Sequence, residues 1–591
     1  MASLTQRATA WLRLEGPSRE ASPMVIAAAV ASSLIFAVYQ WLLPRPIPGI
    51  PYNPEAARRI LGDIPSMLRD ERGAMDWLLA QSQRHSGPVC QLFLRPFGRP
   101  FVLLSDFREA QDIMMRRKEW DRSDYSIEIF SGQAPEHHIN KKTGPAWKSH
   151  RRLLQDLMMP TFLKGVAAPN IYASTMNLVE LWTTKAKLAC GRPFDADKDI
   201  FHASLDAVLE FSFGASYPHR AVAPQIHHIR SMSADEIANR IDTKTGAVKF
   251  DSAQLHETID ATLHASDVFG DLVDSPWPAI TWWFKSKTPW ERRYIRVRNT
   301  FVMEQIAKAV GRLEAEANVR DVSWVKSAAD LMMQRERLFA NKEQREPAYF
   351  SAAMRDEVIG FVVAGHDTTS TTALWGLKFL ADAPDVQTKL RKALEAAHVE
   401  ALSEERLPNA QDIARSTIPY LEAVIEEILR LANTLPVLDR QTDRDTELLG
   451  YHIPKDTILM LLNRGPSFTE PGFDIDEETR SPSCRMAKTK RGLREWNIAG
   501  MEVFQPERWI KDEGGKEIFD SIAGPALPFG LGTRGCFGRK LAYLELRIIL
   551  TLLLWRFRLH KCPEDLSGYR AVETLTHKPK QCYVQLEEIE R

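Results

Sequence analysis

The amino-acid sequence predicts a mainly α-helical fold with small β-sheets, preceded by one N-terminal transmembrane helix. Beyond residue 55, apolar residues recur mostly at helical spacing. Short apolar stretches at 101–104 and 457–462 are typical of strands. Residues 24–43 form an apolar run without a charge. No change of composition divides residues 55–591, so we expect a single domain there, behind an N-terminal tail of residues 1–23.

The composition indicates a large globular protein of a reducing compartment. The 591 residues carry 77 Lys and Arg against 77 Asp and Glu, and this zero net charge argues against a partner that is a nucleic acid. Hydrophobic residues make up 44% and charged residues 26%, which is ordinary globular composition. The six cysteines are scattered without a CxxC pair, which excludes a disulfide framework and a finger-type zinc site.

Residues 24–43 predict a membrane anchor. As a helix, this run of 20 residues would span about 30 Å, the thickness of a bilayer core. Tyr39 and Trp41 lie near one end, where aromatic rings settle at the headgroup level. A cleaved signal peptide is the alternative, but its apolar region is usually shorter and no small-residue cleavage site follows. Flanking arginines are balanced, so only the scattered thiols favour a cytosolic domain.

Residues 44–54 predict a stiff hinge between the anchor and the domain. They contain five prolines in eleven residues. Because proline fixes φ and lacks an amide donor, neither a helix nor a central strand can form there. Such a segment behaves as a semi-rigid spacer, so we expect it to hold the domain off the membrane.

A glycine-rich loop at residues 528–538 carries the most specific chemical signal. Its glycines let the backbone bend tightly and approach a flat ligand. Its thiol, Cys536, precedes a helical run at 541–554, and a helix N-terminus should make this cysteine more acidic than a free one. Arg534 can pair with a carboxylate. A glycine-rich turn with a buried, inert cysteine is the alternative interpretation.

The pattern Phe529-x-x-Gly532-x-Arg534-x-Cys536-x-Gly538 resembles the heme-binding loop of the cytochrome P-450 family, the heme-thiolate monooxygenases. The resemblance implies the cytochrome P-450 fold for residues 55–591. It also implies heme b as cofactor, Cys536 as the thiolate ligand of its iron, and Phe529, Arg534 and Gly538 as cofactor-binding residues.

A second motif, Ala364-Gly365-His366-Asp367-Thr368-Thr369, matches the oxygen-binding stretch of the family's long central helix. Ala364 and Thr368 are four residues apart and share one helical face, so the Thr368 hydroxyl can bond the Ala364 carbonyl. The resemblance implies that Ala364 and Gly365 leave space over the heme, and that Asp367 and Thr368 are catalytic residues that relay protons. Without it, the motif is a polar helix segment bordered by core residues.

Other matches imply scaffold and propionate-binding roles. Glu427-x-x-Arg430 resembles the family's buried ion pair, and Arg508 its locking arginine. Trp147 and Arg151, at i and i+4, and Arg440 match positions that contact the heme propionates. Residues 465–500 depart from the family as an insertion like those of filamentous fungi. We expect a solvated loop there, because five basic residues crowd its centre: Arg485, Lys488, Lys490, Arg491 and Arg494.

The resemblance implies a monooxygenase that inserts one oxygen atom from O2 into a hydrophobic small molecule, such as a terpenoid or polyketide secondary metabolite. No P-loop, Rossmann fingerprint or flavin domain is visible, so electrons from NADPH must arrive through a separate reductase, the NADPH-cytochrome reductase flavoprotein. The predicted anchor and the resemblance to membrane-anchored members of the family together imply a single-pass protein of the endoplasmic reticulum membrane with a cytosolic catalytic domain. The basic residues expected to face the reductase are Lys141, Lys142, Lys148, Arg152, Arg539 and Lys540.

Two other functions are open on the sequence alone. A reductase-independent heme-thiolate isomerase or dehydratase tends to lose the Asp-Thr pair, which this chain keeps. A non-catalytic heme-binding protein would not need the oxygen-binding helix. Substrate contacts are expected from residues 123–139, from helices near 200–260 and from the strand after Arg440.

Overall fold

The computed structural model describes residues 23–215, 217–316, 324–491 and 498–590, and it confirms a mainly helical fold with small sheets. The longer helices are α3 (Ala74–Arg84), α4 (Phe107–Met115), α5 (Asp124–Ser131), α6 (Pro145–Leu154), α8 (Ala168–Ala189), α9 (Asp197–Phe213), α10 (Val222–Arg230), α12 (Glu257–Val273), α13 (Pro278–Lys285), α14 (Pro289–Ala315), α15 (Ala328–Glu343), α16 (Ala352–Asp382), α17 (Pro384–Ala397), α20 (Pro419–Ala432) and α22 (Arg539–Arg556).

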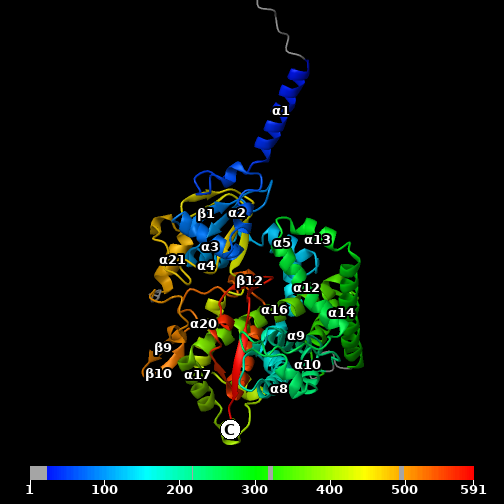
Figure 1. Cartoon of the computed structure of the whole chain (residues 1–591). Helices are drawn as coiled ribbons and strands as arrows, with labels where there is room; N and C mark the ends of the chain where they lie inside the picture. The colour runs from blue at the N-terminus through cyan, green and yellow to red at the C-terminus, as the bar shows by residue number, and fades with distance from the viewer. Residues whose placement is uncertain (1–22, 216, 317–323, 492–497, 591) are drawn as a thin grey trace, which may run out of the picture.

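Helix α16 lies at the centre of the molecule (Figure 1). It packs against α9, α12, α14, α20 and α22, and these helices share the main hydrophobic core. Ser351 caps its N-terminus by accepting a hydrogen bond from the backbone N–H of Met354. It ends at Asp382, two residues before Pro384, because proline disfavours helical conformation in the residue before it.

The largest sheet has five strands in the order β1 (Val89–Leu92), β2 (Phe101–Leu104), β8 (Ile458–Leu462), β5 (Val437–Thr442) and β3 (Trp120–Asp121). The two strands that the sequence predicts pair with each other in parallel, and the other pairs are antiparallel. A three-stranded sheet joins β11 (Phe557–His560), β14 (Tyr583–Glu588) and β4 (Phe194–Asp195). The two-stranded sheets are β6 (Thr446–Leu448) with β7 (Tyr451–Ile453), β9 (Ile510–Glu513) with β10 (Lys516–Phe519), and β12 (Ala571–Glu573) with β13 (His577–Pro579).

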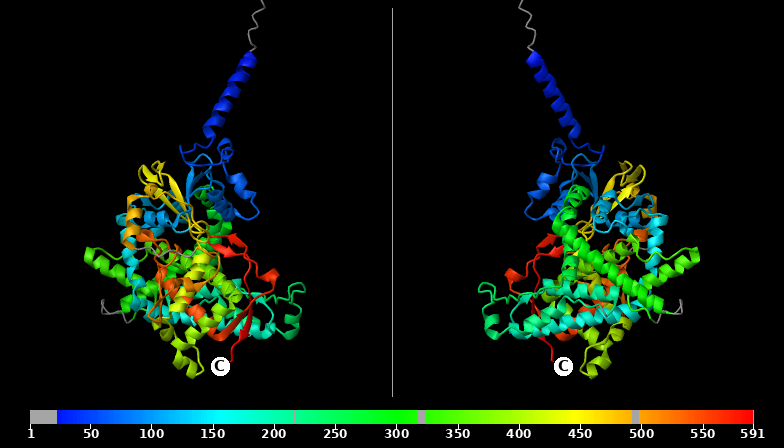
Figure 2. Two further views of the ribbon diagram at one scale, coloured as in Figure 1. Left: turned by 90° about the vertical axis from the view of Figure 1, so that its left-hand side faces the viewer. Right: turned by 90° about the vertical axis from the view of Figure 1, so that its right-hand side faces the viewer.

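The N-terminal helix α1 (Pro23–Leu42) projects from the five-stranded-sheet end of the molecule (Figures 1 and 2). Its Tyr39 hydroxyl donates a hydrogen bond of 2.8 Å to the carbonyl oxygen of Arg58. Within the part of the chain that the structure describes, no helix is both long enough and apolar enough to cross a membrane. The helix predicted at 24–43 is therefore present, whereas its transmembrane role is not confirmed.

The proline-rich segment 44–54 forms neither a helix nor a strand, as its composition predicts. It is not a free spacer, however, because it is bound to β1. Gln91 donates to the carbonyl oxygens of Ile47 and Ile50, at 2.9 and 2.8 Å, and accepts from the Ile47 backbone N–H at 2.8 Å. Both isoleucines are buried, so apolar packing adds to these hydrogen bonds.

The insertion at 465–500 corrects a second expectation, since its first part is a docked structure and not a solvated loop. It contains a 3-10 turn, η5 (Glu477–Thr479), and α21 (Pro482–Arg491), which packs on α4. The buried Arg480 guanidinium donates to both oxygens of Asp106, the N-cap residue of α4, at 2.7 and 3.1 Å. Of the five basic residues, only Arg485 has a described side chain; it is half-exposed and pairs with Glu478.

Candidate active site

The thiol loop has a tightly bent backbone between β10 and α22. The Cys536 backbone N–H donates to the Phe529 carbonyl at 2.8 Å, and Gly532–Arg534 form a 3-10 turn, η7. Gly532 has a φ of +67°, and a Cβ there would lie 2.2 Å from the carbonyl oxygen of Met114 in α4. Glycine is thus required at this position both for its conformation and for the approach of α4. Gly538 is the N-cap residue of α22.

Cys536 is accessible, although protein atoms surround its thiol closely enough to desolvate it. Burial raises the pKa of this thiol, and the backbone N–H groups of Gly538 and Arg539 and the charge of Arg151 only partly oppose the shift. The prediction that a helix N-terminus makes Cys536 more acidic than a free cysteine is therefore wrong for the protein chain itself. Loss of hydration outweighs the helix dipole here.

A stripe of accessible residues runs along α16, which is otherwise buried. From Asp356 to Leu380, every residue is buried except the five members of the stripe: Gly360, Phe361, Ala364, Gly365 and Thr368. These positions recur at i, i+1, i+4, i+5 and i+8, so they lie on one face of the helix. The Phe361 ring lies 5.9 Å from the ring of Phe537, the residue after Cys536, so the stripe adjoins the thiol loop.

The two residues predicted to relay protons have different environments. The Thr368 hydroxyl is on the stripe and donates to the Ala364 carbonyl at 2.7 Å, which confirms the predicted hydrogen bond. Asp367 is buried beside the stripe, and its Oδ2 has no hydrogen-bond partner among the described residues. Burial raises the pKa of this carboxyl, while the neighbouring His366 and a hydrogen bond from Thr576 oppose the shift.

Four arginines converge near the thiol loop, and we call them the arginine cradle. Three were predicted from the sequence; Arg122 was missed because it follows β3 in a segment without a recognisable motif. The buried Trp147 ring brings two of them together, because the guanidinium carbons of Arg151 and Arg534 lie 5.5 and 5.2 Å from its centroid. Arg440 is buried and donates to the Asp439 carbonyl at 2.7 Å. The cradle comprises Arg122, Arg151, Arg440 and Arg534.

The cradle carries more positive charge than its acidic neighbours compensate. Burial, and then the charge of Arg122, lowers the pKa of Arg534 to about 9 and that of Arg440 to about 10. The nearest carboxylate to Arg534 is Asp121, 3.9 Å from its Nε. Two buried nitrogens, Arg122 Nε and Arg534 Nη1, have no hydrogen-bond partner among the described residues. Such a site favours an anionic ligand, and a pair of carboxylates such as the heme propionates fits it.

The predicted Glu427–Arg430 pair is a fully buried scaffold in α20. The Arg430 guanidinium donates to both Glu427 oxygens, at 2.8 and 2.7 Å. The backbone N–H of Gln505 and the indole of Trp509 complete the shell around Glu427, at 3.1 and 2.9 Å. Arg508 lies close enough to interact electrostatically with Glu427, and donates to the carbonyls of residues 499 and 500. The segment that precedes the thiol loop is thereby tied to α20.

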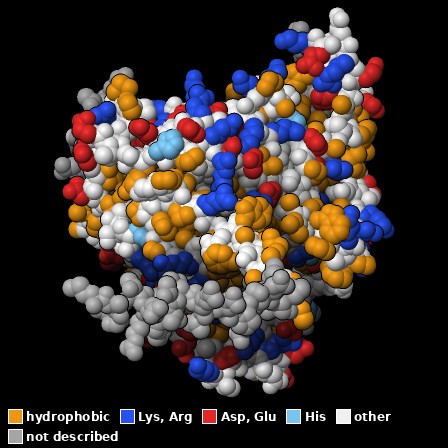
Figure 3. Space-filling view, turned by 90° about the horizontal axis from the view of Figure 1, so that it is seen from above, with side chains coloured by type: hydrophobic (Ala, Val, Ile, Leu, Met, Phe, Trp, Pro, Cys, Tyr) orange, Lys and Arg blue, Asp and Glu red, His pale blue; other side chains and the backbone are white. Residues whose placement is uncertain are grey.

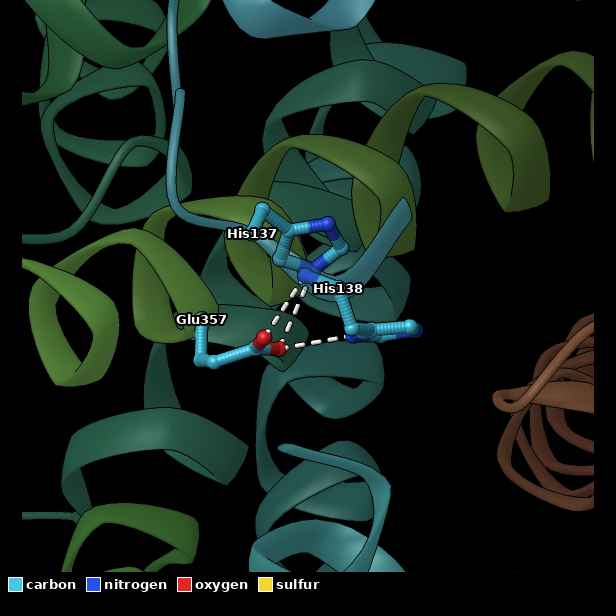
Figure 4. A group of neighbouring side chains, drawn as sticks. All are labelled: His137, His138 and Glu357. Carbon is cyan, nitrogen blue, oxygen red and sulfur yellow. Dashed lines mark hydrogen bonds and ion pairs between the residues drawn. The ribbon is translucent and has the colours of Figure 1, made fainter. Parts of the chain in front are cut away.

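His137, His138 and Glu357 have the spacing of a metal site, with ligand atoms within 4.8 Å of one another (Figure 4). Hydrogen bonding argues against one. The backbone N–H of Ile139 donates to Nδ1 of His137 at 3.2 Å, so this imidazole carries its proton on Nε2, the atom that faces Glu357 at 3.3 Å. Burial lowers the pKa of His137 to about 4, so the ring is neutral near pH 7. The cluster is a hydrogen-bonded carboxylate.

One of the helices near 200–260 that were expected to contact the substrate is buried. Residues 202–214 of α9 and its C-cap lie in the main core. They pack against α16 beside the stripe, since a Cβ on Gly365 would lie 2.7 Å from Val208. Residues 123–139 and β5 do adjoin each other, because the Ser126 hydroxyl donates to Asp439 at 2.7 Å.

Comparison with known proteins identifies the class of protein that this fold and this thiol loop define. The family model of cytochrome P450 matches residues 59–464 and 498–583, and leaves most of the insertion between them. Cytochrome P450 monooxygenase TRI13 from Fusarium sporotrichioides is 41% identical over 575 residues, which cover 94% of this chain and 98% of that protein. Cytochrome P450 monooxygenase xilC from Penicillium crustosum is 35% identical over 561 residues, 94% of each chain. Cytochrome P450 1A2 from Callithrix jacchus is 25% identical over 568 residues, 93% of each.

The chain therefore belongs to the cytochrome P450 family. With monooxygenase relatives at 35–41% identity over nearly the whole length, it is an enzyme of the monooxygenase class and of the fungal type. Membership implies a heme-thiolate iron cofactor. The individual roles of the site residues stay predictions.

Proposed function

We propose that this enzyme inserts one atom of O2 into a hydrophobic small molecule, with Cys536 as the thiolate ligand of the heme iron. One oxygen atom enters a C–H bond of the substrate, and the other leaves as water with two electrons and two protons. The observation that carries the proposal is the convergence of an accessible thiol, the α16 stripe and the arginine cradle. When bound, the heme supplies the oxygen chemistry.

The chain's own residues would then position the cofactor and manage protons. Arg122, Arg151, Arg440 and Arg534 would hold the propionates. The small residue Ala364 would leave room for O2 at the stripe, whereas the missing Cβ of Gly365 accommodates Val208 of α9. Thr368 can order a water at the stripe, and Asp367, whose free oxygen lies just behind it, can exchange a proton with that water.

The electrons are proposed to come from NADPH through a separate flavoprotein reductase. The expected docking residues support this, because five of the six are exposed: Lys142, Lys148, Arg152, Arg539 and Lys540. Arg539 stands at the first turn of α22, directly after the thiol loop, and its guanidinium carbon lies 5.8 Å from the Phe529 ring centroid. An acidic partner surface bound there would lie close to the iron ligand, as short-range electron transfer requires.

We further propose that the enzyme attaches to the endoplasmic reticulum membrane and takes apolar substrates, terpenoids or polyketides, from it. Apolar side chains of α1 are exposed, among them Leu34, Ile35 and Trp41. A second group of exposed apolar residues, the apolar collar, lies on elements at the same end (Figure 1): Leu61, Leu68, Phe97, Ile280, Trp283 and Phe284. Figure 3 looks onto this end and shows apolar side chains among charged ones of both signs, with several Lys and Arg near its centre.

The decisive experiment replaces the proposed ligand. Cys536→Ser should abolish the absorbance at about 450 nm that a reduced thiolate-bound heme shows with carbon monoxide. Cys562→Ser, a buried cysteine that donates to the Tyr583 carbonyl, is the matched control and should keep the band. A Cys536→Ser protein that retains the band would remove Cys536 as the ligand. Reductase-dependent NADPH consumption on adding substrate would then separate oxygen insertion from a reductase-independent rearrangement.

A further inference from the structure

Glu357 is a buried carboxylate of α16 for which the proposed chemistry has no use. Its side chain is completely buried, yet it accepts hydrogen bonds from the backbone N–H and the Nδ1 of His138 and from the Nδ1 of His150, all at 2.7 Å. Nε2 of His137 lies 3.3 Å from the same carboxylate (Figure 4). Burial alone would raise the pKa of Glu357, but His137 and the hydrogen bonds from His138 and His150 hold it well below the usual range. The carboxylate is therefore an anion near pH 7.

The donors come from two segments that both lead to the arginine cradle. On one side, Ile139 follows the two histidines; its N–H bonds to His137, and its carbonyl accepts a hydrogen bond from Arg534 Nη2 at 3.4 Å. On the other side, His150 directly precedes Arg151 in α6, and Trp147, one turn earlier, stacks against both Arg151 and Arg534. Glu357 thus contacts both segments that orient these arginines.

The same carboxylate belongs to the helix that carries the accessible stripe. The His137 ring packs directly against the α16 backbone at Gly360, the first residue of the stripe. A Cβ on Gly360 would lie 2.3 Å from the ring, so only glycine allows this contact. The neighbouring Asp356 adds a further tie, since it accepts a hydrogen bond of 2.9 Å from the Glu136 backbone N–H. Segment 136–139 is therefore held rigidly against α16.

We infer that Glu357 is a positioning residue that fixes the arginine cradle relative to the stripe of α16. The residues proposed to bind the heme propionates and those proposed to face O2 then keep their relative positions. The inference rests on the proposed function, in which the cradle binds the heme propionates. A neutral side chain cannot replace the anion, because two imidazole N–H groups and one backbone N–H donate to it, and a third imidazole nitrogen lies 3.3 Å away. A glutamine would turn an NH2 group toward some of these donors.

The test measures the rate at which the holoenzyme releases heme to excess apomyoglobin. Glu357→Gln should release heme about tenfold faster or more, as expected when a partner that orients a cofactor ligand is lost. Arg534→Ala should also accelerate release. Because Glu357 acts partly through Arg534, the double variant should release heme more slowly than the product of the two single effects predicts. The matched control is Glu545→Gln, which changes a buried glutamate of α22 that accepts a hydrogen bond from Ser204, and release should stay within about twofold.

A second pair of variants tests the inference if Glu357→Gln does not fold. His150→Ala removes one donor, whereas His150→Asn places an amide N–H where Nδ1 stood. Release should accelerate in the alanine variant and return toward the wild-type rate in the asparagine variant. Additive effects of Glu357→Gln and Arg534→Ala, or equal rates for the two His150 variants, would overturn the inference. Either result in an enzyme whose carbon monoxide band still depends on Cys536 would leave the proposed function intact.

Discussion

The hydroxyl of Thr368 donates its proton to the carbonyl oxygen of Ala364, at 2.7 Å, on the accessible stripe of α16. The donor capacity of Thr368 is therefore used within the helix, and only its lone pairs remain for another partner. In this arrangement Thr368 can accept a hydrogen bond from a water but cannot itself donate to a ligand without breaking the bond to Ala364. Its role is to hold a water in place.

Thr368→Ala should uncouple NADPH consumption from product formation. The helix should persist, because alanine is a better helix former than threonine, and substrate should still bind. Without the ordered water, more of the electrons should leave as hydrogen peroxide, so product per NADPH falls. Thr369→Ala is the control, since that side chain is buried away from the stripe. Product, NADPH and peroxide are measured together; unchanged coupling in Thr368→Ala would contradict the assignment.

Gly532→Ala should destabilise the thiol loop and lose heme. The left-handed backbone alone costs about 1–2 kcal/mol for a residue with a Cβ, and here the Cβ would also lie 2.2 Å from the Met114 carbonyl oxygen. Gly514→Ala separates the two effects, because Gly514 has a φ of +68° and no atom within 4 Å of such a Cβ. The unfolding temperature and the heme content should fall more in Gly532→Ala than in Gly514→Ala. Equal losses in the two variants would mean that the contact with α4 does not limit the residue at position 532.

Arg480→Ala should destabilise the enzyme by about 3–5 kcal/mol, because it leaves the buried Asp106 without its ionic partner. Arg485→Ala, in the same insertion, should change stability by less than about 1 kcal/mol, since its ion pair with Glu478 is largely exposed. Denaturant titration of both variants checks the docking of the insertion on α4. Similar small effects would mean that residues 477–484 are dispensable for the fold.

Glu545→Gln should stabilise the enzyme, and more so at higher pH. Burial, opposed only by the Ser204 hydroxyl, raises the pKa of Glu545 to about 8. In the unfolded chain this carboxyl ionises near its ordinary value of about 4.3. Between these values the folded state binds more protons, so wild-type stability falls as pH rises, by at most about 1.4 kcal/mol per unit. The advantage of the variant should therefore grow from pH 5 to pH 8 in thermal unfolding. Glu587→Gln is the control, because Glu587 is exposed and a hydrogen bond from His560 lowers its pKa. The stability difference between this variant and the wild type should not grow from pH 5 to pH 8.

Deleting residues 1–43 should release most of the protein from microsomal membranes while the heme spectrum is kept, because α1 projects from the folded body. Some attachment should persist through the apolar collar. Replacing Ile280, Trp283 and Phe284 with serine in the truncated protein should weaken it further. Fractionation with a carbonate wash checks this; a truncated chain that resists extraction like an integral protein would refute attachment through α1.

The local features of the site were predictable from sequence because their geometry depends on a few consecutive residues. The i, i+4 spacing of Ala364 and Thr368 sets their shared face and their hydrogen bond. The i, i+3 spacing of Glu427 and Arg430 likewise predicts their ion pair. Arg122 and Glu357 were missed for the opposite reason. Neither lies in a recognisable motif. The hydrogen-bond donors of Glu357 are 207 and 219 residues away, and Arg122 meets Arg440 and Arg534 only in the folded chain.

Short stretches of consecutive residues were thus enough to predict the family, the thiol loop, the α16 motif and the absence of regular structure in the proline-rich segment. Three matters depended on atoms that distant segments bring together. Burial beneath surrounding elements reversed the expected pKa shift of Cys536. The insertion is docked on the domain because its Arg480 pairs with Asp106, which lies far away in the sequence. Three histidines from two other segments lower the pKa of the buried Glu357, so that it is ionised. Desolvation and hydrogen bonding depend on what surrounds a group in space, and the order of residues along a chain does not contain that information until the chain is folded.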